Sequence, residues 1–249
     1  MSKYRGLVFD IDETIVPNKA ITIKSKPLID AFASLPEDVI AIAATGRIKS
    51  YAFPVISYLK LKHDSVVANG AQIINSTSGR TMYSQNLALS QVKQVYKICE
   101  PYNYKIIQPS KSKKSLRSFS TKPRITPALF VNNVKYNDAK YLLNKVKQIS
   151  NVYAYLAIAW DNPKNFDIGI GHVNAQKHIA LERLYKKYNL KPEEVIGVGD
   201  GINDIELFNA VGHKIAVANA NPKLLEQADE IVPSQQEDGI VTVINKYFN

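Results

Sequence analysis

The chain has 249 residues, of which 45% are hydrophobic and 22% are charged, a composition typical of folded globular proteins rather than disordered chains. No apolar run reaches the roughly 20 residues of a membrane-spanning helix, and the first residues lack the pattern of a secretory signal. Cys99 is the only cysteine, which excludes an intrachain disulfide. These features predict a cytoplasmic protein. The net charge of +10 suits anionic partners, either small phosphorylated molecules or nucleic acid.

The N-terminal third of the chain alternates apolar runs with segments of helical spacing. The apolar runs predict strands at 5–9, 39–44 and 65–68, because an unbroken apolar run is typical of a strand buried on both faces. Apolar residues recur at helical spacing in 25–35, and a further helix is expected around Pro54. This alternation predicts a doubly wound α/β sheet.

The pattern changes in the middle of the chain. Two helices are expected among several strands, without strict alternation, which predicts an α+β unit with an antiparallel sheet. The helices are expected at 90–99 and 138–149, and the strands at 104–107, 128–131, 152–159 and 166–170.

The α/β pattern returns after Asn174. We expect helices at 179–188 and 204–211 and strands at 195–199 and 214–217. The predicted fold class is therefore α/β, with a doubly wound, Rossmann-like core of parallel strands and an inserted α+β domain. The core is expected to comprise residues 1–84 and 172–249, and the inserted domain residues 85–171.

Polar side chains follow four of the predicted strands. Ligands of an open parallel sheet bind at the carboxyl ends of its strands, so these side chains are expected to meet in one crevice. Lys177 lies near the start of a helix soon after the inserted domain and can join them. The strand-end groups are Asp10 and Asp12, Thr45-Gly46-Arg47, Asn69-Gly70, and the segment from Asp200 to Asp204.

Four of these residues are aspartates, and their charges favour a bound cation. Carboxylates that lie close together repel one another unless a cation sits among them. A set of oxygen ligands favours Mg²⁺, and no histidine or cysteine near these positions indicates zinc. The candidate metal ligands are Asp10, Asp12, Asp200 and Asp204.

The remaining residue types suit phosphoryl transfer. Thr45 can donate a hydrogen bond to a phosphate oxygen, and Lys177 can neutralise both the phosphate and a nucleophilic carboxylate. A carboxylate that attacks phosphorus divides hydrolysis into two steps through an aspartyl phosphate. Mg²⁺ and Lys177 would reduce the repulsion between this carboxylate and an anionic substrate.

The order of the motifs resembles that of a known superfamily. The segment from Asp10 to Thr14, then Thr45-Gly46-Arg47, Lys177 and the segment from Gly199 to Asp204 resemble the four motifs of the haloacid dehalogenase superfamily of phosphatases. The inserted domain is similar to the C2-type cap of its Cof-like (type IIB) branch, and Asn69-Gly70 matches a strand-end motif of that branch.

The resemblance implies a role for each motif residue. Asp10 would be the nucleophile and a metal ligand. Asp12 would be the general acid and then the general base, with its backbone carbonyl on the metal. Asp200 would be a side-chain metal ligand, while Asn203 and Asp204 would shape the metal shell and hold Lys177. The catalytic residues would be Asp10, Asp12 and Lys177, and the phosphate or substrate would contact Thr45, Gly46, Arg47, Asn69 and Asn203.

Two positions depart from the family pattern. Many relatives have glycine where this chain has Glu13, and many have glycine where it has His178. Neither departure removes a group that the proposed chemistry needs. Both are expected to alter loop geometry or substrate fit, and His178 is expected on a helix surface rather than in a catalytic role.

The predicted function is that of a Mg²⁺-dependent phosphatase acting on a small phosphorylated metabolite, such as a sugar phosphate. The alternatives are a phosphoglycolate-type phosphatase, a phosphomutase, and a non-catalytic domain that retains a metal site. The charge and the basic cluster within residues 111–124 also leave open a protein that binds nucleic acid or another polyanion. Neither nucleic acid nor a membrane is the expected partner, and the oligomeric state is not readable from the sequence.

Overall fold

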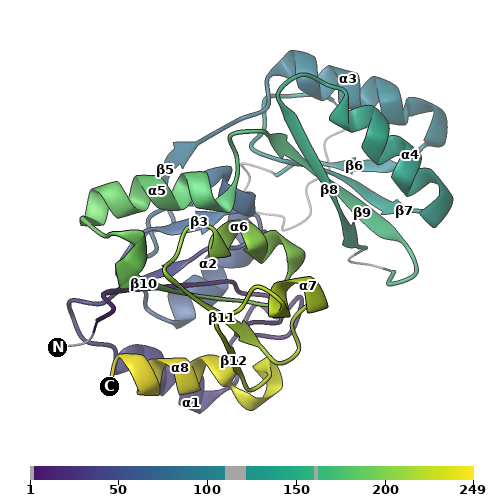
Figure 1. Ribbon diagram of the computed structural model, residues 1–249. Coiled ribbons are helices and arrows are strands. Elements are labelled where there is room, and N and C mark those ends of the chain that lie inside the picture. Colours follow the sequence, from purple (N-terminus) through teal and green to yellow (C-terminus); the bar gives the residue numbers. More distant parts are fainter. Residues whose placement is uncertain (1–2, 110–121, 160–161) are drawn as a thin grey trace. The chain divides into compact units, whose positions relative to one another are not determined.

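The computed structural model describes residues 3–109, 122–159 and 162–249 and divides the chain into two compact units (Figure 1). The unit that we call the core comprises Met1–Tyr83 and Gln176–Asn249, and the cap comprises Ser84–Ala175. The cap continues beyond residue 171, the end expected from the sequence, because strand β9 runs as far as His172. Within the described ranges, the structure contains no helix with the length and apolar character needed to cross a bilayer.

A parallel sheet of five strands, in the order β12-β11-β10-β1-β2, forms the centre of the core. β1 and β10 are buried along their whole length, as expected for strands that are covered on both faces. Phe9 at the end of β1 pairs with Ala43 on one side and Val198 on the other, so the ends of three strands lie at one level. The strands are β1 (Gly6–Phe9), β2 (Ile40–Ala43), β10 (Val195–Gly199), β11 (His213–Val217) and β12 (Glu230–Val232).

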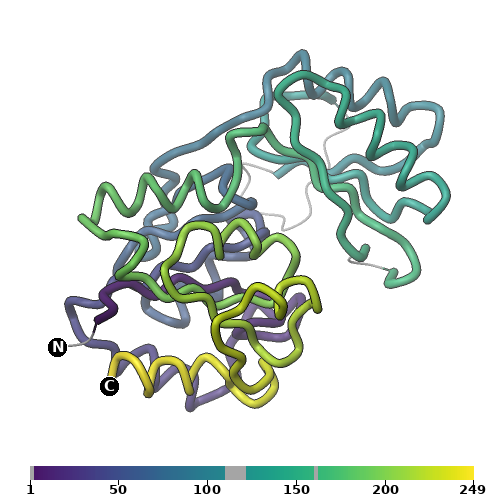
Figure 2. Tube along the Cα trace, viewed as in Figure 1, coloured from purple at the N-terminus to yellow at the C-terminus, as the bar shows by residue number. Residues whose placement is uncertain are grey.

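Helices and a smaller sheet complete the core. Ser25 caps the N-terminus of α1, because its side chain accepts a hydrogen bond from the Leu28 amide. Helix α1 contacts α8, which comes from the far end of the chain (Figure 2). The helices are α1 (Lys26–Ala33), α2 (Lys49–Tyr58), α5 (Lys177–Tyr188), α6 (Ile205–Phe208), α7 (Pro222–Leu225) and α8 (Gly239–Tyr247). The smaller sheet contains β3 (Ser65–Val67), β4 (Gln72–Ile74) and β5 (Thr81–Ser84).

The described part of the cap is an antiparallel sheet with two helices, α3 and α4, on one face (Figure 1). Its own core is apolar and includes Cys99, whose burial raises the pKa of the thiol to about 11, so packing accounts for this residue. The strand order is β6-β7-β9-β8, with β6 (Lys105–Ile107), β7 (Leu129–Val134), β9 (Phe166–His172) and β8 (Val152–Ile158), and the helices are α3 (Leu89–Cys99) and α4 (Tyr136–Lys147).

One predicted helix differs in a way that matters for the site. The sequence pattern predicts a helix over 204–211, whereas the structure has a 3₁₀ turn at Ile202–Asp204 followed by the short helix α6. The Asp204 carboxylate accepts hydrogen bonds from the amides of Asp200 and Gly201 at 3.0 and 2.9 Å. These bonds make the start of the segment a tight turn rather than regular helix.

Candidate active site

The core sheet brings three of the predicted motifs together at the carboxyl ends of neighbouring strands. Asp10 directly follows β1, which lies between β10 and β2, and Asp200 directly follows β10. Thr45 follows β2 and is fully buried. The chain goes from β1 to β2 on one side and later returns to β10 on the other, so Asp10 lies at the switch point where doubly wound sheets bind ligands.

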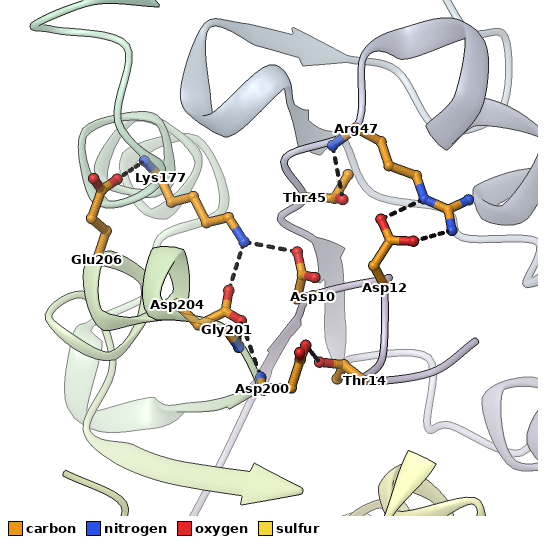
Figure 3. Close-up of polar contacts among 10 residues, drawn as sticks. All are labelled: Asp10, Asp12, Thr14, Thr45, Arg47, Lys177, Asp200, Gly201, Asp204 and Glu206. Carbon is orange, nitrogen blue, oxygen red and sulfur yellow. Dashed lines mark hydrogen bonds and ion pairs between the residues drawn. The ribbon is translucent and has the colours of Figure 1, made fainter. Parts of the chain in front are cut away.

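Lys177 is the only lysine among the buried polar residues that the structure describes. Its Nζ lies 2.7 Å from Oδ1 of Asp10 and 2.6 Å from Oδ1 of Asp204 (Figure 3). Burial alone would lower the pKa of the ammonium group, but the two carboxylates raise it above its ordinary value. Lys177 is therefore a fixed positive charge next to Asp10.

A close backbone contact positions Lys177. Gly70 has a φ of +95°, and a Cβ atom there would lie 2.2 Å from the carbonyl oxygen of Gln176, the residue before Lys177. Only glycine allows this approach. Glu206 adds a second restraint, since its Oε2 accepts a hydrogen bond of 3.0 Å from the Lys177 amide at the start of α5.

Three carboxylates form a candidate metal site. Each of Asp10, Asp200 and Asp204 offers an oxygen atom, and these atoms lie within 4.8 Å of one another. Burial, followed by the charges of neighbouring aspartates, raises the pKa of Asp10 to about 7 and that of Asp200 to about 8, while Lys177 opposes both shifts. The donors are hard oxygen atoms, so the residues present fit a small divalent cation.

Hydrogen bonds distinguish these three carboxylates from one another. Asp204 uses Oδ1 for Lys177 and Oδ2 for two backbone amides. Asp200 accepts one hydrogen bond of 2.7 Å from the hydroxyl of Thr14, which orients its carboxylate. Asp10 and Asp200 therefore keep more of their acceptor capacity than Asp204 does.

Asp12 points away from this cluster, toward Arg47 (Figure 3). Oδ2 of Asp12 accepts from Nε of Arg47 at 2.8 Å, and Oδ1 accepts from Nη2 at 2.5 Å. The sequence places Asp12 among the metal ligands, through its backbone carbonyl according to the resemblance, and Arg47 among the phosphate-binding residues. In the structure their side chains pair with each other.

The other predicted phosphate-binding residues lie around the ends of β2, β3 and β10. The Thr45 hydroxyl accepts a hydrogen bond of 3.2 Å from the Arg47 amide, which leaves its proton available to a ligand. A Cβ atom on Gly46 would lie 3.0 Å from the side-chain oxygen of Asn69. Asn203 is half-buried, and its side chain lies against Gly201.

Three residues contribute to the site without having been given a role from the sequence. Thr14 orients Asp200, Glu206 binds the Lys177 amide, and the amide group of Asn219 donates a 2.8 Å hydrogen bond to the carbonyl of Glu13. Thr14 lies inside the first motif, so its place in the sequence is a signal that it belongs to the site. Glu206 and Asn219 bind backbone groups that are distant in the sequence, and no local sequence pattern indicates these contacts.

Most of the basic cluster within residues 111–124, including Lys111, Lys113 and Arg117, lies outside the described residues. Lys122 is exposed, and Nη2 of Arg124 donates to the carbonyl of Pro109 at 2.8 Å. The aromatic ring of Tyr155 covers Gly169 within the cap sheet. Trp160, the single tryptophan of the sequence, also falls outside the part of the chain that the structure describes.

A doubly wound core, a lysine clamped between aspartates at its switch point and an inserted antiparallel cap define a hydrolase of the haloacid dehalogenase type. The model of the haloacid dehalogenase-like hydrolase family matches residues 7–244 of the chain. The chain belongs to this family, which confirms the prediction from the motifs.

Similar proteins extend over almost the whole chain. The phosphoglycolate phosphatase of Staphylothermus marinus is 27% identical over 253 residues, covering 98% of each protein. Phosphoglycolate phosphatase 1 of Saccharolobus solfataricus is 23% identical, covering 96% of this chain and 94% of the relative.

Solved structures share the fold. A haloacid dehalogenase-like hydrolase from Bacteroides thetaiotaomicron matches with a TM-score of 0.81 and 19% identity, covering 98% of this chain and all (100%) of that one. A sugar phosphatase of subclass IIB of the same superfamily matches with a TM-score of 0.78 and 19% identity over 98% of both chains.

Proposed function

We propose that this phosphatase of the haloacid dehalogenase family hydrolyses a small phosphorylated metabolite through an aspartyl phosphate on Asp10, with Mg²⁺ as its cofactor. The observation that carries the proposal is the buried contact of Lys177 with Asp10 and Asp204, next to the carboxylate of Asp200. A buried cation beside a strand-end carboxylate suits a nucleophile that must approach an anionic phosphate.

The first step forms the covalent intermediate. Lys177 holds Oδ1 of Asp10, so the other carboxylate oxygen is the one available to attack phosphorus. As the new bond forms, the bond from phosphorus to the ester oxygen breaks, and that oxygen takes a proton from Asp12. Lys177 offsets the negative charge that the reacting groups bring together.

The second step releases phosphate. The Asp12 carboxylate takes a proton from water, and the water oxygen attacks phosphorus and breaks its bond to Asp10. The products are inorganic phosphate and the free Asp10 carboxylate, and Asp12 regains its proton for the next cycle. One residue therefore serves as acid and then as base.

Asp10 and Asp200 are the side chains that would hold Mg²⁺. The ion would supply charge neutralisation and Lewis acidity at the phosphate when it is bound. Asp204 is better suited to position Lys177 than to bind the metal ion, because both of its oxygens already accept hydrogen bonds. Asp12 would contribute its backbone carbonyl, since its carboxylate lies on Arg47.

A substrate that carries a carboxylate as well as the phosphate is the second candidate within this function. Relatives that align along almost their whole length are named phosphoglycolate phosphatases, while the subclass IIB neighbour is a sugar phosphatase. A panel containing both kinds of ester, assayed for inorganic phosphate, separates these candidates and separates hydrolysis from a mutase reaction, which releases none.

Replacement of the nucleophile tests the mechanism. Asp10→Asn should abolish turnover, on the order of 10⁴-fold or more, because an amide cannot attack phosphorus at a useful rate. With labelled substrate and an acid quench, the wild-type protein should retain label that hydroxylamine removes. Asp30→Asn, an exposed change on α1, is the control and should behave like wild type. Near-normal activity of Asp10→Asn would refute covalent catalysis by this residue.

Removal of the metal tests the cofactor. Chelation should stop hydrolysis and added Mg²⁺ should restore it, because Asp10 and Asp200 would otherwise repel the phosphate. Activity that is indifferent to chelator would rule out the metal part of the proposal while leaving the role of Asp10 to be decided by the labelling experiment.

A further inference from the structure

The Arg47 guanidinium is anchored from three sides. Nε and Nη2 hold the two oxygens of Asp12, and Nη1 donates to the backbone carbonyls of Ala20 at 2.6 Å and Tyr51 at 3.3 Å. Its side chain is only 2% exposed. A guanidinium with these partners cannot turn toward a bound phosphate without breaking buried hydrogen bonds, which is costly.

The fork geometry orients the Asp12 carboxylate. Two parallel N–H···O bonds define the plane of a carboxylate as well as its position, which a single bond to lysine does not do. The anchor points of Arg47 lie in the segment after the first motif and in α2, so three parts of the chain meet at this pair.

The hydrogen bonds also distinguish the two oxygens of Asp12. A carboxylate has about four acceptor positions, two on each oxygen. Oδ1 accepts from Nη2 of Arg47 and, at 3.3 Å, from the amide of Lys19, whereas Oδ2 accepts only from Nε of Arg47 among these donors. One acceptor position therefore stays open, and it is on Oδ2.

We propose that Arg47 is a positioning residue for proton transfer, which holds Asp12 so that its Oδ2 gives the proton to the leaving oxygen and takes it from water. This inference rests on the proposed function and replaces the role in phosphate binding that the sequence predicts for Arg47. The proton moves between Oδ2 and the substrate or water oxygen, and Arg47 itself stays protonated throughout.

Leaving-group dependence tests the inference. Arg47→Lys keeps the charge and loses the fork. For an alkyl phosphate, kcat/KM should fall about 100-fold, the scale of a misplaced acid–base group. For p-nitrophenyl phosphate, whose leaving group departs without a proton, kcat/KM should fall by less than about 5-fold. The ratio kcat/KM is the right quantity because it includes only steps up to the aspartyl phosphate.

Two further measurements separate positioning from phosphate binding. Inorganic phosphate should inhibit Arg47→Lys and wild type with inhibition constants within about 3-fold, whereas loss of a phosphate ligand weakens inhibition more than about 10-fold. Added guanidinium, below denaturing concentrations, should restore alkyl phosphate hydrolysis to Arg47→Ala. It should not increase the activity of Arg5→Ala, which loses an exposed contact with Glu194 and serves as the control.

A double substitution shows whether Arg47 acts through Asp12. In an Asp12→Asn background, Arg47→Lys should cost no further alkyl phosphate activity, because the residue being positioned is already lost. Equal losses for both esters, a parallel rise in the phosphate inhibition constant, or an additive loss in the double variant would each overturn the inference. A wild-type protein without phosphatase activity would instead contradict the proposed function.

Discussion

Glu13 occupies a backbone conformation that its own side chain disfavours. Its φ of 54° lies in the left-handed region, where the resemblance to the family leads one to expect glycine. Three hydrogen bonds hold it there: Oε1 of Glu13 accepts from the Asn18 amide at 2.6 Å, its carbonyl accepts from Asn219 at 2.8 Å, and its amide donates to the carbonyl of Val16 at 2.8 Å. Residues outside the first motif therefore stabilise the loop between Asp10 and Thr14.

Comparison of two substitutions isolates this strain. Glu13→Ala and Glu13→Gly both lose the hydrogen bond to Asn18, but only glycine relieves the left-handed backbone. Glu13→Gly should therefore be more stable than Glu13→Ala by about 1 kcal/mol, measured by urea unfolding. Equal stability of the two variants would show that the loop relaxes to another conformation when the side chain is shortened.

Asp10 and Asp200 make the stability of the metal-free protein depend on pH. Their pKa values are raised to about 7 and about 8 by burial and mutual repulsion, against roughly 3.9 for an unfolded aspartate. Because the folded state binds these protons more tightly, the stability they contribute is present at low pH and lost as the pH rises through 7 and 8. Thermal unfolding in chelator should show a lower midpoint at about pH 8.5 than at about pH 5.5.

A matched variant assigns this effect to the cluster. Asp200→Asn removes a charge that the folded protein accommodates poorly, so in chelator it should be more stable than wild type at about pH 8.5, with the difference shrinking at about pH 5.5. Mg²⁺ should raise the melting temperature of wild type most at the higher pH and that of Asp200→Asn much less. The opposite pH trend in wild type would mean that the carboxylates do not share one buried site.

At the scale of elements, the sequence predicts what continuous local patterns encode. β1 and β10 are unbroken apolar runs, and both were expected. Helix α8 was not, because its segment from Ile240 to Ile244 is rich in β-branched residues, which have low helix propensity. The helix is stabilised because Ile240, Val243 and Ile244 pack into the core. This is a tertiary interaction, which a local sequence pattern does not predict.

The same distinction applies to the candidate site. The rule that strand ends converge predicts that Asp10 and Asp200 meet in one crevice, and the position of Lys177 at a helix start predicts that it joins them. It could not predict which carboxylate pairs with which cation, because that depends on side-chain directions. Asp12 and Arg47 illustrate this: the sequence predicts both in the crevice, and their pairing with each other follows only from the geometry.

The contact between Gly70 and the start of α5 can be tested by adding one methyl group. Gly70→Ala would place Cβ 2.2 Å from the Gln176 carbonyl, so α5 must move and Lys177 with it. We expect kcat to fall on the order of 100-fold, because about 1 Å of misplacement costs that much. The control is Gly79→Ala: Gly79 has a φ of +66°, and the atoms nearest to an added Cβ would be ring atoms of Phe53, the first at 3.0 Å.

Both variants should lose about 1 kcal/mol or more of unfolding free energy from their left-handed backbone, measured by chemical denaturation. Only Gly70→Ala should lose turnover in the folded state. Similar activity in the two variants would show that the backbone contact does not position Lys177.

For the whole molecule, the distribution of charge is uneven. Residues 84–175 contain 14 lysines and arginines and 4 acidic residues, which accounts for the entire net charge of +10. The core has 18 basic and 18 acidic residues and is formally neutral. Exposed lysines of the cap, such as Lys140 and Lys147 on α4, form no ion pair within the described part of the chain. The cap therefore carries a field that attracts anions.

Salt dependence tests what this field does. If it draws the substrate to the enzyme, kcat/KM should fall several-fold between roughly 20 and 500 mM salt, and more for an ester that also carries a carboxylate. Replacing Lys140 and Lys147 with glutamine should flatten this dependence, whereas the same change at Lys24 and Lys186, exposed lysines of the core, should not. A flat profile in wild type, combined with salt-sensitive oligonucleotide binding that persists in Asp10→Asn, would assign the charge to a polyanionic partner instead.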